Sequence, residues 1–305
     1  MGGVPRIGTI GAVTRDFVQL YDGLRLHFSE WGSEQATVVL VHGLGSSSHI
    51  WDLVASTLAH EYRVLALDQR GHGESDQPDG GYDFPTIVGD LVAFLERVGS
   101  DAPAVFVGHS WGASVVLNFA VEHPERAAGI VLLDGGTGSP GERWTWDETV
   151  KRLTPPDIDG MQWSDLRQRM VGRNGALADP RVVAVSRSLF NVAADGRISR
   201  RFRIPNHMKI VRALWEQRPT ELLPRVQCPV LILPARQSSD GPDFLAAKSQ
   251  AVDRAVALQP RARVRWFEET IHDVPLQRPD ELAQELLGFA RDVLPFGVHR
   301  QRSLR

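Results

Sequence analysis

Short runs rich in Val, Leu and Ile recur along the chain, and amphipathic segments of helical length separate them. Each run is too short for a helix, and its composition is typical of strands buried on both faces of a sheet. Strands that alternate with helices favour a mostly parallel α/β sheet covered on both faces by helices. The expected buried strands are 38–41, 64–67, 104–107, 130–133, 230–233 and 264–267, and the expected helices are 51–59, 85–98, 110–122, 246–258 and 279–293.

Two segments differ from this alternation of strands and helices. Residues 17–20 and 24–28 flank Asp22-Gly23, a dipeptide typical of a hairpin turn. Between residues 135 and 227 the alternation stops, with apolar residues at helical spacing but no convincing buried strand. Connections within such sheets are short, so this interval predicts an inserted helical cap. The expected organisation is a core in two parts, 1–137 and 227–305, with a cap at 138–226.

Composition and charge narrow the possible partners. The 305 residues carry a formal net charge of −3, which gives no electrostatic basis for binding nucleic acid or an anionic membrane. The single cysteine, Cys228, excludes an internal disulfide. The N-terminal residues lack the apolar run of a signal peptide, and no stretch approaches the roughly 20 apolar residues of a membrane span. We therefore expect a cytoplasmic protein with a frayed basic end at 298–305. The sequence does not decide its oligomeric state.

The pentapeptide Gly108-His109-Ser110-Trp111-Gly112 is the strongest chemical signal in the chain. Gly-x-Ser-x-Gly alone is common by chance, but here it follows a buried strand and precedes a helical run. A sharp strand-to-helix turn of this kind lifts the serine hydroxyl above the sheet, and the flanking glycines avoid collisions in the turn. The helix N-terminus also favours negative charge at the same point. Ser110 is the predicted nucleophile.

The sequence His42-Gly43-Leu44-Gly45 directly follows another expected strand, 38–41. A loop at this position can present a backbone amide opposite the serine. Together with the amide of Trp111, it would form an oxyanion hole with two donors. Leu44 is the preferred donor of this loop and Gly45 the second choice, whereas His42 is expected to have a structural role.

His272 is the candidate general base. It lies late in the chain, in a loop after the last expected strand. Where a serine nucleophile lies in a strand-to-helix turn, the acid and then the histidine follow it along the chain, and the position of His272 fits this order. His109 is less suitable, since adjacent residues on a turn point apart. The glycine-rich segment 68–75 follows the strand 64–67 and is expected to be a structural turn.

Four features together resemble the α/β-hydrolase superfamily over nearly the whole chain. They are the His-Gly loop at 42–45, the turn at 68–75, the strand-to-helix turn that carries Ser110, and the late histidine His272. The resemblance implies the α/β-hydrolase fold, and the interval after residue 133 looks like the helical cap that many members insert there. Haloalkane dehalogenases and epoxide hydrolases of this superfamily use an aspartate as nucleophile. Because Ser110 stands at that position, neither activity is expected.

The resemblance implies a catalytic triad of Ser110, His272 and a carboxylate, but it does not decide which carboxylate. Most members place it after the strand corresponding to 230–233, but the loop here lacks the usual Gly-x-x-Asp pattern, and Asp240 and Asp243 arrive a few residues late. A minority, including some lactone hydrolases, takes the acid from the end of the preceding strand, where Asp134 stands. Asp134 is preferred, and Asp240 remains the alternative. Either would orient and stabilise the imidazole.

The resulting hypothesis is a serine hydrolase that cleaves a carboxylic ester or lactone through an acyl-enzyme, without a metal or organic cofactor. Hydrolysis of carbon–carbon bonds and perhydrolysis are alternatives, and so is a hydrolase-like receptor that binds a small ligand with little turnover. The aromatic residues of the cap favour an apolar substrate of small to medium size, although they could equally serve packing alone. The candidate substrate-binding residues are Trp144, Trp146, Trp163 and Trp215.

Overall fold

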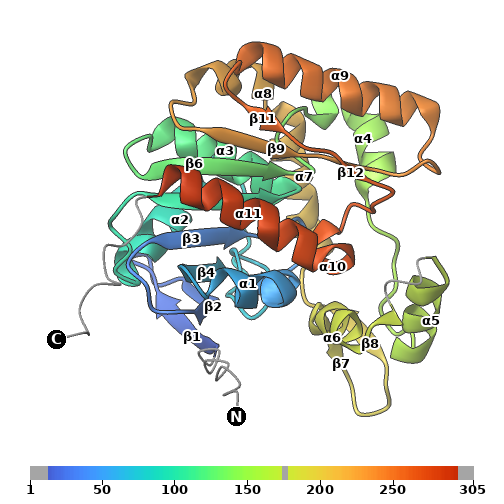
Figure 1. The fold of residues 1–305 in the computed structure, drawn as a ribbon. Helices are drawn as coiled ribbons and strands as arrows, with labels where there is room; N and C mark the ends of the chain where they lie inside the picture. The colour runs from blue at the N-terminus through green and yellow to red at the C-terminus, as the bar shows by residue number, and fades with distance from the viewer. Residues whose placement is uncertain (1–12, 174–177, 295–305) are drawn as a thin grey trace, which may run out of the picture.

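A computed structural model describes residues 13–173 and 178–294 (Figure 1). Its centre is an eight-stranded sheet in the order β1-β2-β4-β3-β5-β6-β9-β11. From β4 to β11 all neighbours run parallel, whereas β1 and β2 form an antiparallel edge. This confirms the predicted mostly parallel sheet. The strands are β1 (Thr14–Gln19), β2 (Arg25–Trp31), β3 (Thr37–Val41), β4 (Arg63–Leu67), β5 (Ala104–His109), β6 (Ala127–Leu133), β9 (Val230–Leu233) and β11 (Arg263–Val264).

Helices cover both faces of the sheet (Figure 1). On one face α1 (Asp52–Leu58) packs beside α11 (Pro279–Val293), with the short α10 (Val274–Gln277) next to them. On the other face α2 (Phe84–Arg97) packs beside α3 (Trp111–Glu122). The expectations for the N-terminal residues and for 298–305 fall outside the described residues.

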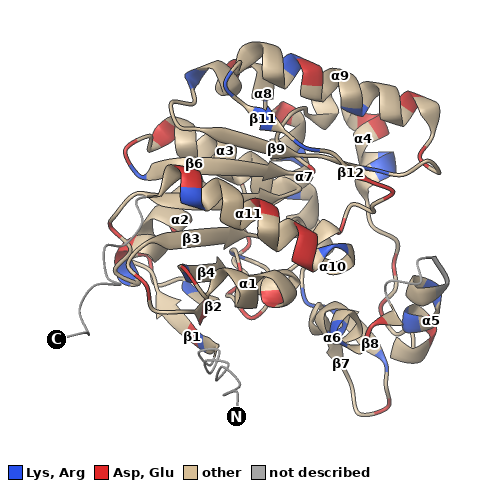
Figure 2. Ribbon diagram, viewed as in Figure 1, with Lys and Arg blue, Asp and Glu red and all other residues tan. Residues whose placement is uncertain are grey.

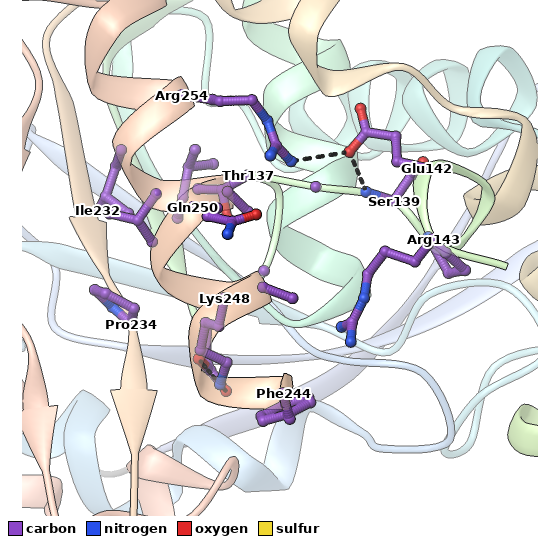
Figure 3. A pocket seen from close by; sticks show the side chains of 18 of the residues that line it. Thr137, Ser139, Glu142, Arg143, Ile232, Pro234, Phe244, Lys248, Gln250 and Arg254 are labelled. Atoms are coloured by element: carbon purple, nitrogen blue, oxygen red, sulfur yellow. Dashed lines mark hydrogen bonds and ion pairs between the residues drawn. The ribbon is translucent and has the colours of Figure 1, made fainter. Parts of the chain in front are cut away.

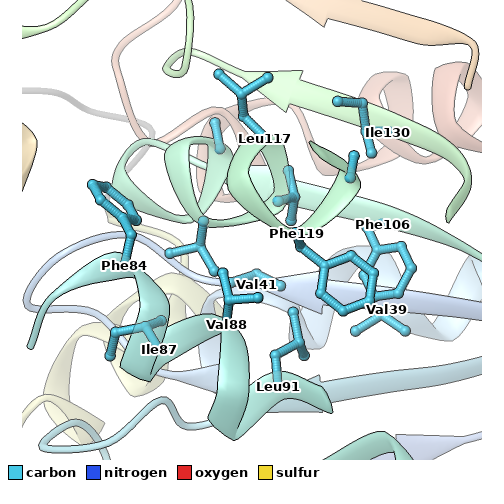
Figure 4. Close-up of a cluster of buried hydrophobic side chains, with 14 of the residues drawn as sticks. Val39, Val41, Phe84, Ile87, Val88, Leu91, Phe106, Leu117, Phe119 and Ile130 are labelled. Atoms are coloured by element: carbon cyan, nitrogen blue, oxygen red, sulfur yellow. The ribbon is translucent and has the colours of Figure 1, made fainter. Parts of the chain in front are cut away.

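The core divides into two clusters, one on each face of the sheet. Successive residues of a strand point to opposite faces. Val39 and Val41 of β3 therefore pack with α2 and α3, whereas Val38 and Leu40 pack with α1 and α11. Figure 4 shows the first cluster, in which Phe119 of α3 lies beside the strand side chains. Each fully buried side chain of this kind stabilises the fold by about 1.5–3 kcal/mol.

The interval between β6 and β9 contains helices and, in addition, a short hairpin that the sequence analysis missed. Strands β7 (Phe190–Val192) and β8 (Ile198–Arg200) pair antiparallel. Gly196 in their turn has φ +84°, a value that favours glycine, and it follows Asp195 in a hairpin dipeptide. The strands escaped prediction because they have three residues each and lie outside the main sheet. The helices of the interval are α4 (Trp146–Leu153), α5 (Trp163–Arg173), α6 (Pro180–Ser188), α7 (Ile204–Glu216) and α8 (Pro219–Leu222).

The last expected strand, 264–267, was wrong as a single element. The chain forms β11 and then β12 (Phe267–Glu268), which leaves the main sheet and pairs with β10 (Ala235–Arg236). Pro234 separates β9 from β10 and has no N–H for a ladder, which explains the break. Helix α9 (Pro242–Leu258) also begins four residues earlier than expected, with a proline in its first turn.

Charged side chains avoid the centre of the sheet. Strands β3, β6 and β9 contain none, whereas the edge strands β1 and β2, the helices and the connecting segments carry charged residues that are coloured in Figure 2. Among the described helices, none is both long and apolar enough to cross a membrane.

Candidate active site

Ser110 lies in the tight turn between β5 and α3, with φ +56° and ψ −118°. Positive φ is strained for a residue with a side chain, and such strain persists only where the surroundings enforce it. The Ser110 N–H donates to the Leu133 carbonyl oxygen at 2.8 Å. A Cβ on Gly108 would lie 2.2 Å from the Gly112 oxygen, and one on Gly112 would lie 2.2 Å from the Val41 oxygen. Both flanking glycines are therefore required by close packing.

The loop after β3 lies against this turn. A Cβ on Gly43 would come within 3.0 Å of the Ser110 Cβ, so the loop backbone and the serine are direct neighbours. Within residues 13–173 and 178–294, the N–H groups of Leu44 and Trp111 have no hydrogen-bond partner. The Trp111 N–H is one of the free donors at the start of α3. Two unused donors thus flank Ser110.

His72 binds the backbone of the same loop. Its Nε2 accepts the Gly45 N–H at 3.1 Å, and its Nδ1 donates to the Arg70 oxygen at 3.1 Å. The ring is buried and stacks on Trp111 and Phe202. Burial lowers the pKa of His72 well below its ordinary value. The ring is therefore neutral, and its Nε2 can accept the hydrogen bond from the Gly45 N–H. Gly45, the second predicted donor, is engaged by His72, whereas Leu44 stays free.

His272 pairs with Asp134. The His272 Nδ1 lies 2.6 Å from the Asp134 Oδ2, although 138 residues separate them in the chain. The Asp134 side chain is 2% exposed, whereas that of His272 is 52% exposed. Asp134 follows β6 at once and has φ +45°, a second strained backbone beside the serine turn. Its Oδ1 accepts the Ala235 N–H at 2.9 Å.

The pair shifts the pKa of both partners. Burial raises the pKa of Asp134, but the hydrogen bond with His272 and the nearby positive charges outweigh it, so that the pKa lies far below its ordinary value. Packing around the imidazole lowers the pKa of His272, but the hydrogen bond and charge of Asp134 reverse the effect, and the pKa is raised. An ionised Asp134 facing His272 fixes the ring orientation and stabilises its protonated form.

Asp240 does not reach this site. Its Oδ2 accepts the Gln237 N–H at 3.0 Å and closes the turn of its own loop. In the described part of the chain, Asp240 has no hydrogen bond or ion pair with His272. The structure therefore brings Asp134 to the imidazole and leaves the alternative acid in its loop.

Two residues that the sequence analysis did not assign support the pair. The His109 Nε2 donates to the His272 carbonyl oxygen at 2.8 Å, and the two rings lie 4.7 Å apart. Burial and the charge of His272 lower the pKa of His109 to about 4. Lys248 of α9 places its Nζ 2.9 Å from the Asp134 Oδ1 and 2.8 Å from the Ala235 oxygen. His109 thus fixes the backbone of His272, and Lys248 fixes the carboxylate of Asp134.

The four tryptophans predicted to bind substrate contact one another or other residues of the interval between β6 and β9. Trp215 donates its Nε1–H to the Trp144 oxygen and packs edge to face on Trp146, while Trp163 packs on Phe190 of β7. A cavity of about 110 Å³ meets the loop after β3 at Gly45, and none of its described lining residues is a tryptophan. Packing therefore accounts for these contacts, and a direct substrate contact stays a prediction.

Comparison with known proteins identifies the family. Residues 38–285 match the sequence profile of the alpha/beta hydrolase family. The chain therefore belongs to this family, and the predicted family and fold are confirmed. The relatives described next are enzymes, which supports an enzymatic hydrolase.

Its relatives have varied activities. A non-heme chloroperoxidase from Streptomyces lividans is 27% identical over 285 residues, which covers 88% of this chain and 97% of that protein. Epoxide hydrolase A of Mycobacterium tuberculosis is 41% identical over 128 residues, or 41% of this chain and 39% of that protein. The bifunctional epoxide hydrolase 2 of Sus scrofa is 39% identical over 126 residues, or 22% of its length. The chain thus matches well under half the length of these epoxide hydrolases.

Solved structures share the fold over most of the chain. An E-2-(acetamidomethylene)succinate hydrolase superposes with a TM-score of 0.73 and 20% identity, covering 91% of this chain and 99% of that one. The enol-lactonase from Burkholderia xenovorans LB400 superposes with a TM-score of 0.68 and 21% identity, covering 90% and 99%. At these identities the likeness establishes the fold alone.

Proposed function

We propose that the protein is a serine hydrolase that cleaves a carboxylic ester or lactone through an acyl-enzyme. The observation that carries this proposal is the strained turn that presents Ser110 between two unused backbone donors. Nucleophilic catalysis of acyl transfer needs these parts together with a base that is itself oriented by a third group. The pair of His272 and Asp134 supplies that base and its orienting acid.

In the proposed mechanism His272 takes the proton of Ser110 as the serine oxygen attacks the carbonyl carbon. The oxyanion accepts hydrogen bonds from the Leu44 and Trp111 N–H groups, each worth about 2.7–4 kcal/mol in the transition state. His272 then protonates the leaving alcohol, and an acyl-enzyme remains. Water that gives a proton to His272 attacks the acyl carbon. The bond between this carbon and the Ser110 oxygen then breaks, His272 returns the proton to the serine oxygen, and the acid is released. Asp134 stabilises the imidazolium in both steps.

The nucleophile argues against epoxide opening, although epoxide hydrolases are among the relatives. Attack of Ser110 on an epoxide carbon would form an ether, which has no carbonyl for water to attack, so the enzyme would not turn over. Ester and lactone carbonyls avoid this outcome. The small cavity at Gly45 has a largely apolar lining that includes Leu189, Phe202 and Ile204, which favours an apolar acyl or alcohol group.

Perhydrolysis is a second candidate, favoured by the chloroperoxidase relative that aligns over nearly the whole chain. It would use the same acyl-enzyme, with hydrogen peroxide in place of water as the attacking molecule and a peracid as product. Ser110 and His272 would act as in hydrolysis. The ratio of peracid to acid formed in the presence of peroxide separates the two reactions.

The proposal is tested with a panel of p-nitrophenyl esters, lactones and epoxides and the wild-type protein. We expect multiple turnovers on esters or lactones of small to medium apolar acids and no turnover on epoxides. Fewer than one product per protein molecule on every ester and lactone, together with tight ligand binding, would instead support the receptor alternative. Turnover on epoxides alone would contradict the serine mechanism.

The charge of Lys248 predicts a shift in the pH profile. Lys248 lowers the pKa of His272, so Lys248→Met is expected to raise it. The base is active only when neutral, and the acid limb of kcat/KM should therefore move to higher pH. Lys248→Arg keeps a positive charge and should leave the limb near its wild-type position. A limb that stays in place or moves to lower pH in Lys248→Met would show that Lys248 does not act on His272.

A further inference from the structure

A cavity of about 340 Å³ lies between α9 and the loop that follows β6 (Figure 3). Its volume falls in the range of sites for small organic molecules. Asp134 and Lys248 lie in its wall, but Ser110, His272, Leu44 and Trp111 are not among its described lining residues. The cavity therefore lies beside the acid of the proposed triad.

The charges around the cavity favour an anion. Three cationic side chains, Lys248, Arg143 and Arg254, line it against two anionic ones, Asp134 and Glu142. Lys248 binds Asp134, and Arg254 lies 3.7 Å from Glu142, the contact drawn in Figure 3. Among the described residues, Arg143 is the cation of this set without a carboxylate partner. One positive charge is thus left for a ligand.

Arg143 is held in place by aromatic rings. Its guanidinium carbon lies 4.7 Å from the centre of the Trp144 ring and 5.7 Å from that of Phe244. Phe244 is 41% exposed, unusual for a large apolar side chain in this protein. Such stacking leaves the N–H groups at the edge of the guanidinium plane available for a carboxylate.

The cavity also has an apolar part. Ser139 lines the cavity, but it caps the short 3₁₀ helix Pro140–Glu142, and its N–H donates to the Glu142 Oε2 at 3.3 Å. The buried side chains of Leu132 and Ile232 provide an apolar floor.

We infer that this cavity binds a small organic monocarboxylate, whose carboxylate pairs with Arg143 and whose apolar body lies against Ile232, Pro234 and Phe244. Because Arg143 is the single cation of this set without a carboxylate partner in the described part of the chain, we expect a ligand with a charge of −1. The apolar floor and the exposed Phe244 ring favour an aromatic or branched body over a purely polar acid. The inference goes beyond the proposed reaction and does not depend on it.

Benzoate is the probe, with benzamide as its neutral counterpart of similar shape, and binding is measured by isothermal titration calorimetry on the full-length protein. We expect benzoate to bind with one molecule per chain and benzamide to bind at least about tenfold more weakly, as the loss of a charged hydrogen bond requires. Arg143→Met should weaken benzoate binding by at least about tenfold.

Arg152 offers a matched control. Its guanidinium lies 4.9 Å from the same Trp144 ring, but it is not among the described lining residues. Arg152→Met should leave benzoate affinity unchanged, which separates a local contact from a general loss of charge. Circular dichroism and the melting temperature check that each variant is folded. Absence of benzoate binding to the wild type, or equal affinity in the wild type and a folded Arg143→Met, would overturn the inference.

Discussion

Ser110→Ala is expected to lower kcat for ester hydrolysis by about 10⁴-fold or more, to the level that binding and the oxyanion donors alone support. In the proposed mechanism, the strained turn, the two free N–H groups and the pair of His272 and Asp134 all act on one atom, the serine oxygen. Without it no acyl-enzyme forms. The measurement is the steady-state rate on the best ester of the panel, with the circular dichroism spectrum as a check on folding.

Ser114 provides the control for this variant. It lies one turn further along α3 and is 2% exposed, and alanine is well tolerated in a helix. Ser114→Ala should keep activity close to that of the wild type. If Ser110→Ala kept more than about a hundredth of the wild-type kcat, a loss far smaller than nucleophile removal causes in serine hydrolases, the serine mechanism would be wrong.

Asp134→Asn is expected to lower kcat by about 10⁴-fold, because the amide leaves His272 in the wrong tautomer and without a negative charge to stabilise it. The acid limb of kcat/KM should also move to lower pH, since Asp134 raises the pKa of His272. This direction is opposite to that expected for Lys248→Met. The two shifts together test whether both residues act through the same imidazole.

Asp240→Asn is the matched control for the acid. Its carboxylate binds the Gln237 N–H within one loop, so the change should cost little activity. The reverse result, an active Asp134→Asn and an inactive Asp240→Asn, would assign the acid to Asp240 and show that the loop rearranges when substrate binds. Equal losses in the two variants would also contradict the proposed assignment.

The local part of the site could be predicted from the sequence because its determinants are contiguous. The strand, the two glycines, Ser110 and the helix that make the turn all lie within a short stretch of chain, and the α/β fold follows from the alternation of strands and helices. The hairpin of β7 and β8 is also local, but its strands have three residues each, too few for a periodic signal.

The remaining parts of the site depend on contacts between distant residues. His109 and His272 are 163 residues apart, and Lys248 and Asp134 are 114 apart. Nothing in their local sequence marks these contacts, since both arise where strand ends and helices converge in the folded chain. The choice between Asp134 and Asp240 was open for the same reason. Hydrogen bonds in the folded chain bring one carboxylate to His272 and keep the other in its own turn.

The central claim, that Ser110 is the nucleophile of acyl transfer, is tested most directly by mass spectrometry of the protein quenched in acid during turnover of a p-nitrophenyl ester. The proposed mechanism predicts an increase by the mass of one acyl group, carried by the peptide that contains Ser110 and absent from Ser110→Ala. An acyl group on any other residue, or turnover with no acyl-enzyme at any quench time, would contradict it.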